Sequence, residues 1–233
     1  MKLINIAIVF IMLPVIILAG DTLFTENFAS LSKWKEVYFP KIQAHTKYTA
    51  ATDGKETFLK TQSHASASVI IYREPFNPYE YPLLRWRWKI DNVLKGADLK
   101  TRETDDSPIR VYIAFEYNPK KSTAAERALY GSVKLIYGEY PPHSSLNYTW
   151  ASEPSAPDII TSSYTDRSKM IILEKGSRKA GMWIEESVDI IADYRRAFGS
   201  DPPENATLGI MNDTDNTKGS AVSYVTGIVL SRR

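Results

Sequence analysis

The sequence has 233 residues and no cysteine, and its formal net charge at pH 7 is only +2. The absence of cysteine excludes disulfide bonds, thiolate-bound metals and cysteine nucleophiles. The small net charge argues against a protein that binds nucleic acid by neutralising its phosphates. A Gly-x-Ser-x-Gly elbow, a phosphate-binding glycine-rich loop and a dinucleotide fingerprint are also missing from the sequence. We therefore expect neither a hydrolase built on that elbow nor a nucleotide cofactor.

Long apolar runs are missing too, except at the N-terminus. Lys2 precedes a mostly apolar run at 3–18, small residues follow at 19 and 20, and Asp21 opens polar sequence. This layout is typical of a secretory signal peptide. We predict a signal peptide at 1–20 and one domain at 21–233, in a periplasmic or secreted bacterial protein without a membrane span after cleavage. An uncleaved anchor is the alternative, because the run is long enough to cross a bilayer.

Apolar residues are plentiful in the rest of the chain, and many of them alternate with polar ones. The composition is 43% hydrophobic and 12% aromatic, which supplies a sizeable core for one domain of this length. The segments 84–90 and 109–116 alternate almost without a break. Because successive side chains of a strand point to opposite faces, both segments predict strands with one buried and one solvated face, as in antiparallel sheets.

Further strands and two short helices complete the expected fold. Strands are predicted at 42–48, 57–63, 67–72, 133–137, 146–151, 169–173, 182–186, 207–211 and 222–230. One helix begins at the capping-box pair Thr123 and Glu126 and ends at Gly131, and the other spans 193–198 before Gly199. Many short strands separated by turns predict a mostly β fold, an antiparallel β-sandwich or jelly roll with one or two short helices.

Six segments also occur together in a known family. They are Phe-Pro-Lys-Ile at 39–42, Leu-Arg-Trp-Arg-Trp at 84–88, Asp-Asp at 105–106 with Arg-Val-Tyr at 110–112, Trp-Ile-Glu-Glu at 183–186, Asp-Tyr-Arg-Arg-Ala-Phe-Gly at 193–199, and Ile-Met-Asn-Asp-Thr-Asp-Asn-Thr at 210–217. With them the chain resembles the exported bacterial proteins of the domain-of-unknown-function 3047 family. The resemblance covers nearly all of 21–233. It implies an exported single domain with a lectin-like sandwich, and it implies no activity and no site residues.

The loop at 213–219 is rich in oxygen atoms of the kind that bind Ca²⁺. Asp213 and Asp215 have the spacing of the first two ligands of an EF-hand loop. Lys218 then occupies the position of the turn glycine, and no glutamate closes the loop. We take Asp213, Asp215 and Asn216 as candidate metal ligands, with Ca²⁺ as the one cofactor considered. A turn held by side-chain hydrogen bonds to local backbone is the main alternative, and direct contact with a ligand is another.

Three carboxylates are candidate catalytic groups. Asp105 and Asp106 lie in a charged loop before the strand at 109–116, and Glu185 lies two residues after Trp183 on another predicted strand. Two carboxylates on either side of a sugar bond are the minimum for glycoside hydrolysis. The alternative is a solvated loop whose acids pair with nearby arginines such as Arg110.

A basic and aromatic patch is the candidate ligand-binding surface. Arg85 and Arg87 share the polar face of the strand predicted at 84–90, and Arg110 and Tyr112 share that of the strand predicted at 109–116. If these strands pair, the four side chains form one surface that could bind an acidic glycan, because arginine matches carboxylate and sulfate geometry. Trp183 is a further candidate, because an aromatic ring beside a carboxylate is a common sugar-binding arrangement. The alternative is an ordinary wetted sheet face, with Trp183 in the core.

Three functions are compatible with these patterns. The favoured one is a noncatalytic envelope protein that binds a carbohydrate or another polar ligand on the sandwich. The second is a carbohydrate-active enzyme, a glycoside hydrolase or polysaccharide lyase, that uses the carboxylates. The third is a structural envelope protein that acts through protein contacts. A sandwich fold alone does not decide among them, because it hosts all three classes.

Overall fold

The computed structural model describes residues 21–137 and 140–233. The signal peptide predicted at 1–20 lies outside the described residues. Within the described part of the chain, no helix is long and apolar enough to cross a membrane.

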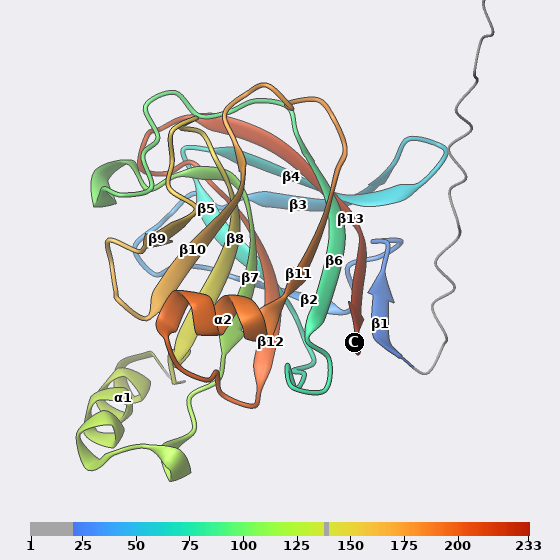
Figure 1. Ribbon diagram of the computed structural model, residues 1–233. Coiled ribbons are helices and arrows are strands. Elements are labelled where there is room, and N and C mark those ends of the chain that lie inside the picture. The colour runs from blue at the N-terminus through green and yellow to red at the C-terminus, as the bar shows by residue number, and fades with distance from the viewer. Residues whose placement is uncertain (1–20, 138–139) are drawn as a thin grey trace, which may run out of the picture.

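In these residues, thirteen strands form two sheets that pack face to face as a β-sandwich (Figure 1). The first sheet, called sheet 1, has the order β11-β6-β13-β4-β3, and β1 also pairs with β13. Its strands are β1 (Thr22–Glu26), β3 (Lys47–Thr52), β4 (Thr57–His64), β6 (Leu83–Ile90), β11 (Ile184–Asp189) and β13 (Ser220–Ser231). The mostly β sandwich predicted from the alternating patterns is therefore confirmed.

Sheet 2 has the order β2-β5-β12-β7-β8-β10-β9. Its strands are β2 (Trp34–Val37), β5 (Ala67–Tyr72), β7 (Ser107–Phe115), β8 (Ser144–Ala151), β9 (Ile159–Thr161), β10 (Ser168–Lys175) and β12 (Ala206–Asp213). All pairs within it are antiparallel except β8 with β10, which run parallel. The chain between these two strands forms β9 and the loops beside it, which bring it back to start β10 in the same direction as β8.

The long strand β13 pairs with three neighbours and contains an irregularity near its middle. Its first half pairs with β4 and its second half with β1, while β6 lies along its other edge. The pairing with β6 shifts between Thr226 and Val229. Gly227 lies in this shift with φ of 60°, a left-handed conformation that glycine adopts without steric cost.

The core between the sheets is built from the apolar faces of the alternating strands. Trp86 and Trp88 of β6 point inward from sheet 1 and contact Tyr148 and Trp150 of β8 in sheet 2, with ring centroids 5.6 and 5.9 Å apart. All four side chains are almost fully buried. Because each strand alternates, the residues beside these aromatics, such as Arg87 and Asn147, lie on the opposite faces of their sheets.

Two α-helices accompany the sheets. The helix α2 (Ile190–Phe198) is capped by Asp189 and ends at Gly199 in a left-handed conformation, so the predicted helix at 193–198 is confirmed with three more residues at its start. Tyr194 of α2 packs edge-on against Phe115 of β7, with ring centroids 4.7 Å apart.

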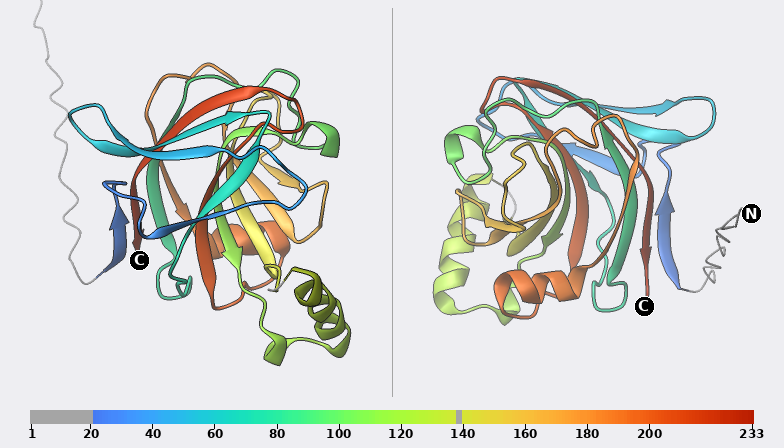
Figure 2. Two further views of the ribbon diagram at one scale, coloured as in Figure 1. Left: turned by 180° about the vertical axis from the view of Figure 1, so that it is seen from behind. Right: turned by 45° about the horizontal axis from the view of Figure 1, so that its top comes forward.

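The helix α1 (Ala124–Tyr137) lies outside the two-sheet body (Figure 2). Two 3₁₀ turns, η1 (Arg102–Thr104) and η2 (Pro119–Lys121), complete the structure.

Three details of the sequence predictions are wrong. The strand predicted at 133–137 is the second half of α1, and the helix does not end at Gly131. The capping box itself is confirmed, because Thr123 and Glu126 exchange hydrogen bonds. The strand predicted at 42–48 begins only at Lys47, because the chain turns at 39–42, where the Ile42 N–H donates to the Phe39 carbonyl.

Candidate ligand-binding site

The face of sheet 2 that points away from the core carries the main candidate site. Along β7, Ile109, Val111 and Ile113 enter the core, so Arg110 and Tyr112 point to the other face. The strand register places Met211 of β12 beside Arg110, and Asn147 of β8 beside Tyr112. Loops at 39–42, 102–106, 162–164 and 213–217 surround this face.

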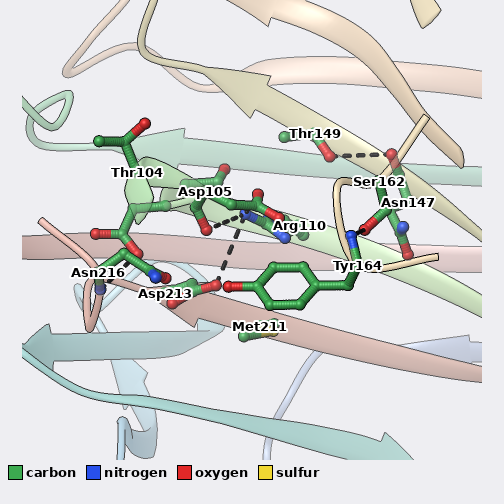
Figure 3. Close-up of polar contacts among 12 residues, drawn as sticks. Thr104, Asp105, Arg110, Asn147, Thr149, Ser162, Tyr164, Met211, Asp213 and Asn216 are labelled. Carbon is green, nitrogen blue, oxygen red and sulfur yellow. Dashed lines mark hydrogen bonds and ion pairs between the residues drawn. The ribbon is translucent and has the colours of Figure 1, made fainter. Parts of the chain in front are cut away.

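Together these strands and loops line a cavity of about 460 Å³. Figure 3 shows how several of its side chains converge from different strands and loops. The lining residues are Phe39, Pro40, Lys41, Ile42, Asp105, Arg110, Tyr112, Asn147, Ser162, Tyr164, Ser168, Met170, Met211, Asp213, Asp215 and Asn216. The cavity therefore combines apolar and aromatic surface with a few polar groups, which is the usual make-up of a small-ligand site.

Arg110 is the central cation of the cavity. Its Nη2 donates to Asp105 at both Oδ1, 2.7 Å away, and the backbone carbonyl, 3.0 Å away. The same nitrogen lies 3.7 Å from Asp213 Oδ2 (Figure 3). The Arg110 side chain is 6% exposed, so this ion pair has little water to compete with it. Arg110 Nη1 donates to the Tyr112 hydroxyl, which donates in turn to Met211 Sδ. Burial raises the pKa of Tyr112, so the hydroxyl keeps its proton at neutral pH.

A second group of acids lies beside this ion pair. Asp106, Asp213 and Asp215 each place one carboxylate oxygen within 4.8 Å of the others. Asp106 is held by the neighbouring loop, because it accepts hydrogen bonds from the Asn216 N–H and from the N–H and hydroxyl of Thr217. Burial raises the pKa of Asp213 well above its usual range, and Arg110 opposes this shift only in part.

The rim of the cavity is tied together at Arg102. Its backbone carbonyl accepts hydrogen bonds from the Tyr164 hydroxyl at 3.1 Å and from Asn216 Nδ2 at 2.9 Å. Its guanidinium lies 4.8 Å from the centroid of the Tyr164 ring and donates to the Ser163 carbonyl. Tyr164 nevertheless stays 53% exposed, and in Figure 3 it reaches toward Asp213 and Asn216. The contacts of Arg102 thus join three loops into one wall.

Several buried polar atoms of the cavity lining have no hydrogen-bond partner. Among the described residues they are Arg110 Nε, Asn147 Oδ1 and Asp213 Oδ1. Asn147 is otherwise oriented by Nδ2, which donates to Ser168 Oγ at 2.7 Å. Unpartnered buried polar groups cost stability and are rare in native folds. Their concentration in one cavity is therefore typical of a functional site.

The predicted ligand-binding residues lie on two different surfaces. Arg110 and Tyr112 belong to the cavity, but Arg85 and Arg87 lie on β6 in sheet 1, which pairs with β11 and β13 and not with β7. The four side chains therefore do not form one patch. Trp183 lies on the outer face of sheet 1 and is partly exposed, and the guanidinium of Arg87 is 5.5 Å from the centroid of its ring. Arg87 also pairs with Glu56.

Of the three candidate catalytic acids, Asp105 and Asp106 lie at the cavity over sheet 2 and Glu185 does not. Asp105 is paired with Arg110, and Asp106 is fully buried and held by loop donors. Glu185 is exposed on β11 in sheet 1, opposite Arg87 in the strand register. The metal candidates Asp213, Asp215 and Asn216 do lie together, and Asp106 joins them.

Sequence reasoning missed two important members of the site. Asn147 lies in a predicted strand, where its alternation with Leu146 and Tyr148 assigns it to the face away from the core. Tyr164 follows Ser162 and Ser163 in a polar loop, and no sequence signal distinguishes it from the other tyrosines, because single aromatic residues in polar loops are common.

A carboxylate pair elsewhere gives the protein a pH-dependent stability. Burial, followed by repulsion from Glu174, raises the pKa of Glu186 from 4.5 to about 7. Between these values the folded state holds a proton that the unfolded state releases, so the free energy of unfolding falls as pH rises from 4.5 to 7. Because Glu186 is only partly buried, we expect Glu186→Gln to raise the free energy of unfolding at pH 8 by about 1–2 kcal/mol and to leave it unchanged at pH 4.

Urea unfolding at both pH values tests this expectation. Glutamine keeps an oxygen that can accept the hydrogen bond from Trp88 Nε1, which lies 3.1 Å from Glu186 Oε1. The control is Glu185→Gln on the exposed face of the same strand, for which we expect a change below about 0.5 kcal/mol. An equal gain for Glu186→Gln at pH 4 and pH 8 would contradict the titration.

A second cavity of about 460 Å³ lies among the loops at 116–122 and 201–205. Glu116, Glu126 and His143 line it, and burial lowers the pKa of His143. Tyr117 also lines it, but its ring is stacked on Tyr130 with centroids 3.8 Å apart. Tyr79, which is 42% exposed, also lines this cavity, but in all the cavity presents less apolar surface than the one over sheet 2.

Comparisons with solved structures find distant similarities. The chain is similar to the family 11 carbohydrate-binding module of the cellulosomal cellulase Lic26A-Cel5E of Clostridium thermocellum, with 10% identity, 91% of this chain and 94% of that chain covered, and a TM-score of 0.46. It is similar to the lectin from Bauhinia forficata in complex with GalNAc, with 10% identity, 90% and 97% covered, and a TM-score of 0.40.

A third similar structure is endoglucanase 3 from family GH12 of Trichoderma harzianum, with 9% identity, 87% and 99% covered, and a TM-score of 0.38. No curated protein matches the chain. A family model described as "Protein of unknown function (DUF3047)" matches residues 32–229.

Proposed function

The chain belongs to the DUF3047 family of proteins of unknown function, and we propose that it binds a carbohydrate without catalysis in the cavity over sheet 2. The observation that carries the proposal is the combination of the half-exposed ring of Tyr164 at the rim with planar polar side chains on the floor. A sugar ring has an apolar face of C–H groups and an edge of hydroxyls, so it needs both kinds of surface.

The apolar part of the cavity suits the face of a sugar ring. Tyr164 presents aromatic surface at the rim, and Met170 and Met211 lie below it on the sheet. Tyrosine combines a rigid apolar body with a polar tip, which suits contact with an amphipathic ligand. The Tyr164 hydroxyl donates to the Arg102 carbonyl, and the Arg102 guanidinium lies over the Tyr164 ring. Because these contacts hold the ring in place, little side-chain entropy remains to be lost on binding.

The polar part favours a neutral glycan. Asp105, Asp213 and Asp215 outnumber Lys41 and Arg110 among the charged lining residues. Without a bound cation, a glycan that carries carboxylates or sulfates would be repelled by this excess of negative charge, whereas hydroxyls can donate to it. A glycan ligand also fits the export predicted from residues 1–20, because envelope polysaccharides lie outside the cytoplasm.

Hydrolysis receives less support from the same geometry. A glycosidase needs one protonated and one ionised carboxyl facing the sugar bond. Asp105 is committed to Arg110, and Asp106 is buried beneath the loop at 216–217. Glu185 lies on the other sheet. These contacts favour binding over bond cleavage.

The proposal predicts a specific loss of affinity. Screening the purified protein on an array of neutral and acidic glycans should identify a neutral ligand. In calorimetric titration, Tyr164→Ala should weaken binding of that ligand at least about tenfold, which corresponds to about 1.4 kcal/mol. Tyr79→Ala is the matched control, because Tyr79 is 42% exposed and lines only the other cavity.

Other outcomes would redirect the proposal. Loss of binding in Trp183→Ala with full binding in Tyr164→Ala would move the site to the outer face of sheet 1. Release of reducing ends from the bound glycan would favour the enzyme. A protein that binds no glycan on the array would contradict the proposal and favour a role through protein contacts.

A further inference from the structure

Three acids from two segments of the chain converge at one corner of the cavity. Asp106 immediately precedes β7, Asp213 is the last residue of β12, and Asp215 follows it in the loop. Their carboxylate oxygens lie within 4.8 Å of one another. Like charges at this distance repel, so the arrangement needs a compensating group.

Positive charge from the protein is too small to compensate for them. With Asp105, four carboxylates gather here, and Arg110 is the one cationic side chain in the described residues that forms an ion pair with any of them. Arg110 is closest to Asp105, at 2.7 Å, and lies 3.7 Å from Asp213. Three negative charges therefore remain in excess when all four acids are ionised.

Asp213 has an unused oxygen directed away from solvent. Its side chain is 7% exposed, and in the described part of the chain its Oδ1 has no hydrogen-bond partner. This oxygen therefore does not accept the hydrogen bond from local backbone that the alternative prediction of a turn requires. A hard cation bonds oxygen at about 2.3–2.6 Å, closer than a hydrogen-bonded water, so it can fill a space that water does not reach.

We propose that Asp106, Asp213 and Asp215 bind a calcium ion that joins the start of β7 to the loop after β12. The donors are oxygens only, without a histidine or cysteine, which matches the preference of Ca²⁺ and not that of zinc or copper. Asp106 is already oriented by its hydrogen bonds from Asn216 and Thr217. Asn216, a candidate ligand from the sequence, donates Nδ2 to Arg102, so its side chain stabilises the loop beside the ion.

The ion would also affect the glycan cavity, a consequence that rests on the proposed function. The loop at 213–217 contacts Arg102 through Asn216, and Arg102 holds Tyr164. Calcium binding should therefore fix the wall that carries the aromatic ring. Calcium affinity is measured without glycan, so failure of the glycan proposal leaves the calcium result readable.

The test is calorimetric titration of chelator-treated full-length protein with calcium chloride, together with thermal unfolding. We expect saturable binding of one Ca²⁺ per chain and a rise of several degrees in the melting temperature. Asp215→Asn should weaken Ca²⁺ binding about a hundredfold, and because Asp215 is partly exposed the variant should still fold. Asp98→Asn, in the neighbouring loop, should bind Ca²⁺ as the unmodified protein does.

Asp213→Asn separates a metal site from a structural carboxylate. Asparagine has a similar shape but cannot carry the negative charge that a cation requires, so this variant should still unfold cooperatively in chelator and should no longer respond to Ca²⁺. Absence of saturable binding and of any thermal shift with the unmodified protein would overturn the proposal. So would a response to Mg²⁺ without one to Ca²⁺, or calcium binding that persists in both aspartate variants.

Discussion

Replacing Arg110 by methionine should lower the free energy of unfolding in chelator by about 3–5 kcal/mol. Methionine fills much of the same volume but removes the cation from Asp105, which is 4% exposed, and from Asp213. The acids are then left buried without their counter-charge, and this penalty exceeds what the lost hydrogen bonds alone would cost. Breaking the ion pair of Arg110 and Asp105 lowers the stability strongly, although the intact pair adds little net stability to the fold.

The matched control for this experiment is Arg87→Met. Arg87 also pairs with a carboxylate, Glu56, but on the outer face of sheet 1, where the two side chains are 38% and 31% exposed. Solvent screens such a pair, so we expect a loss below about 1 kcal/mol. Urea unfolding followed by tryptophan fluorescence measures both variants. Equal losses would show that burial does not set the cost at Arg110.

A double variant identifies the source of the loss. In Arg110→Met with Asp105→Asn, the carboxylate closest to the lost cation becomes neutral, so part of the stability should return. A double variant that is less stable than Arg110→Met would contradict the uncompensated charge of Asp105 as the cause.

Strand positions could be predicted from the sequence, but strand partners could not. The alternation in 84–90 and in 109–116 is a local property, and both segments are strands, β6 and β7. Pairing depends on contacts between distant segments, and β6 pairs with β11 and β13 while β7 pairs with β8 and β12. The prediction that Arg87 and Arg110 share one surface is wrong for this reason.

The error in α1 has a different cause. The segment Val133–Tyr137 is short and rich in apolar residues, so periodicity alone did not distinguish a strand from the end of a helix. The capping box at Thr123 starts a helix through residues with high helix propensity, and the helix continues past Gly131 because this glycine does not adopt a positive φ. A glycine ends a helix only when it adopts the left-handed conformation, as Gly199 does.

The site shows the same division between local and distant information. The sequence makes Asp105 and Asp106 candidates for catalysis, and Asp213 and Asp215 candidates for metal binding, because each pair lies close in sequence. The neighbouring strands β7 and β12 bring the two groups together at their ends. Tyr164 enters from a third segment, and no local pattern connects it with either group.

The largest loss of stability should follow from Trp88→Ala. Trp88 is fully buried, and its ring centroid lies 5.4 Å from that of Trp86 and 5.9 Å from that of Trp150. Truncation removes apolar surface from the core and leaves a cavity between the sheets, at a cost of about 3–5 kcal/mol. The lost aromatic pairs place the cost near the upper end of that range. For a domain of this size we expect the melting temperature in scanning calorimetry to fall by about 10 °C or more.

Trp183→Ala shows whether position or residue type sets this cost. Trp183 lies on the outer face of the same sheet, where it contacts Phe58 and the cationic groups of Arg87 and Lys89. Its surroundings are partly open, so water can replace the ring and no closed cavity forms. We expect a loss of about 1 kcal/mol or less, because exposed cation–π contacts are individually weak. If Trp183→Ala were as destabilising as Trp88→Ala, the assignment of β6 as a strand with one buried and one solvated face would be wrong.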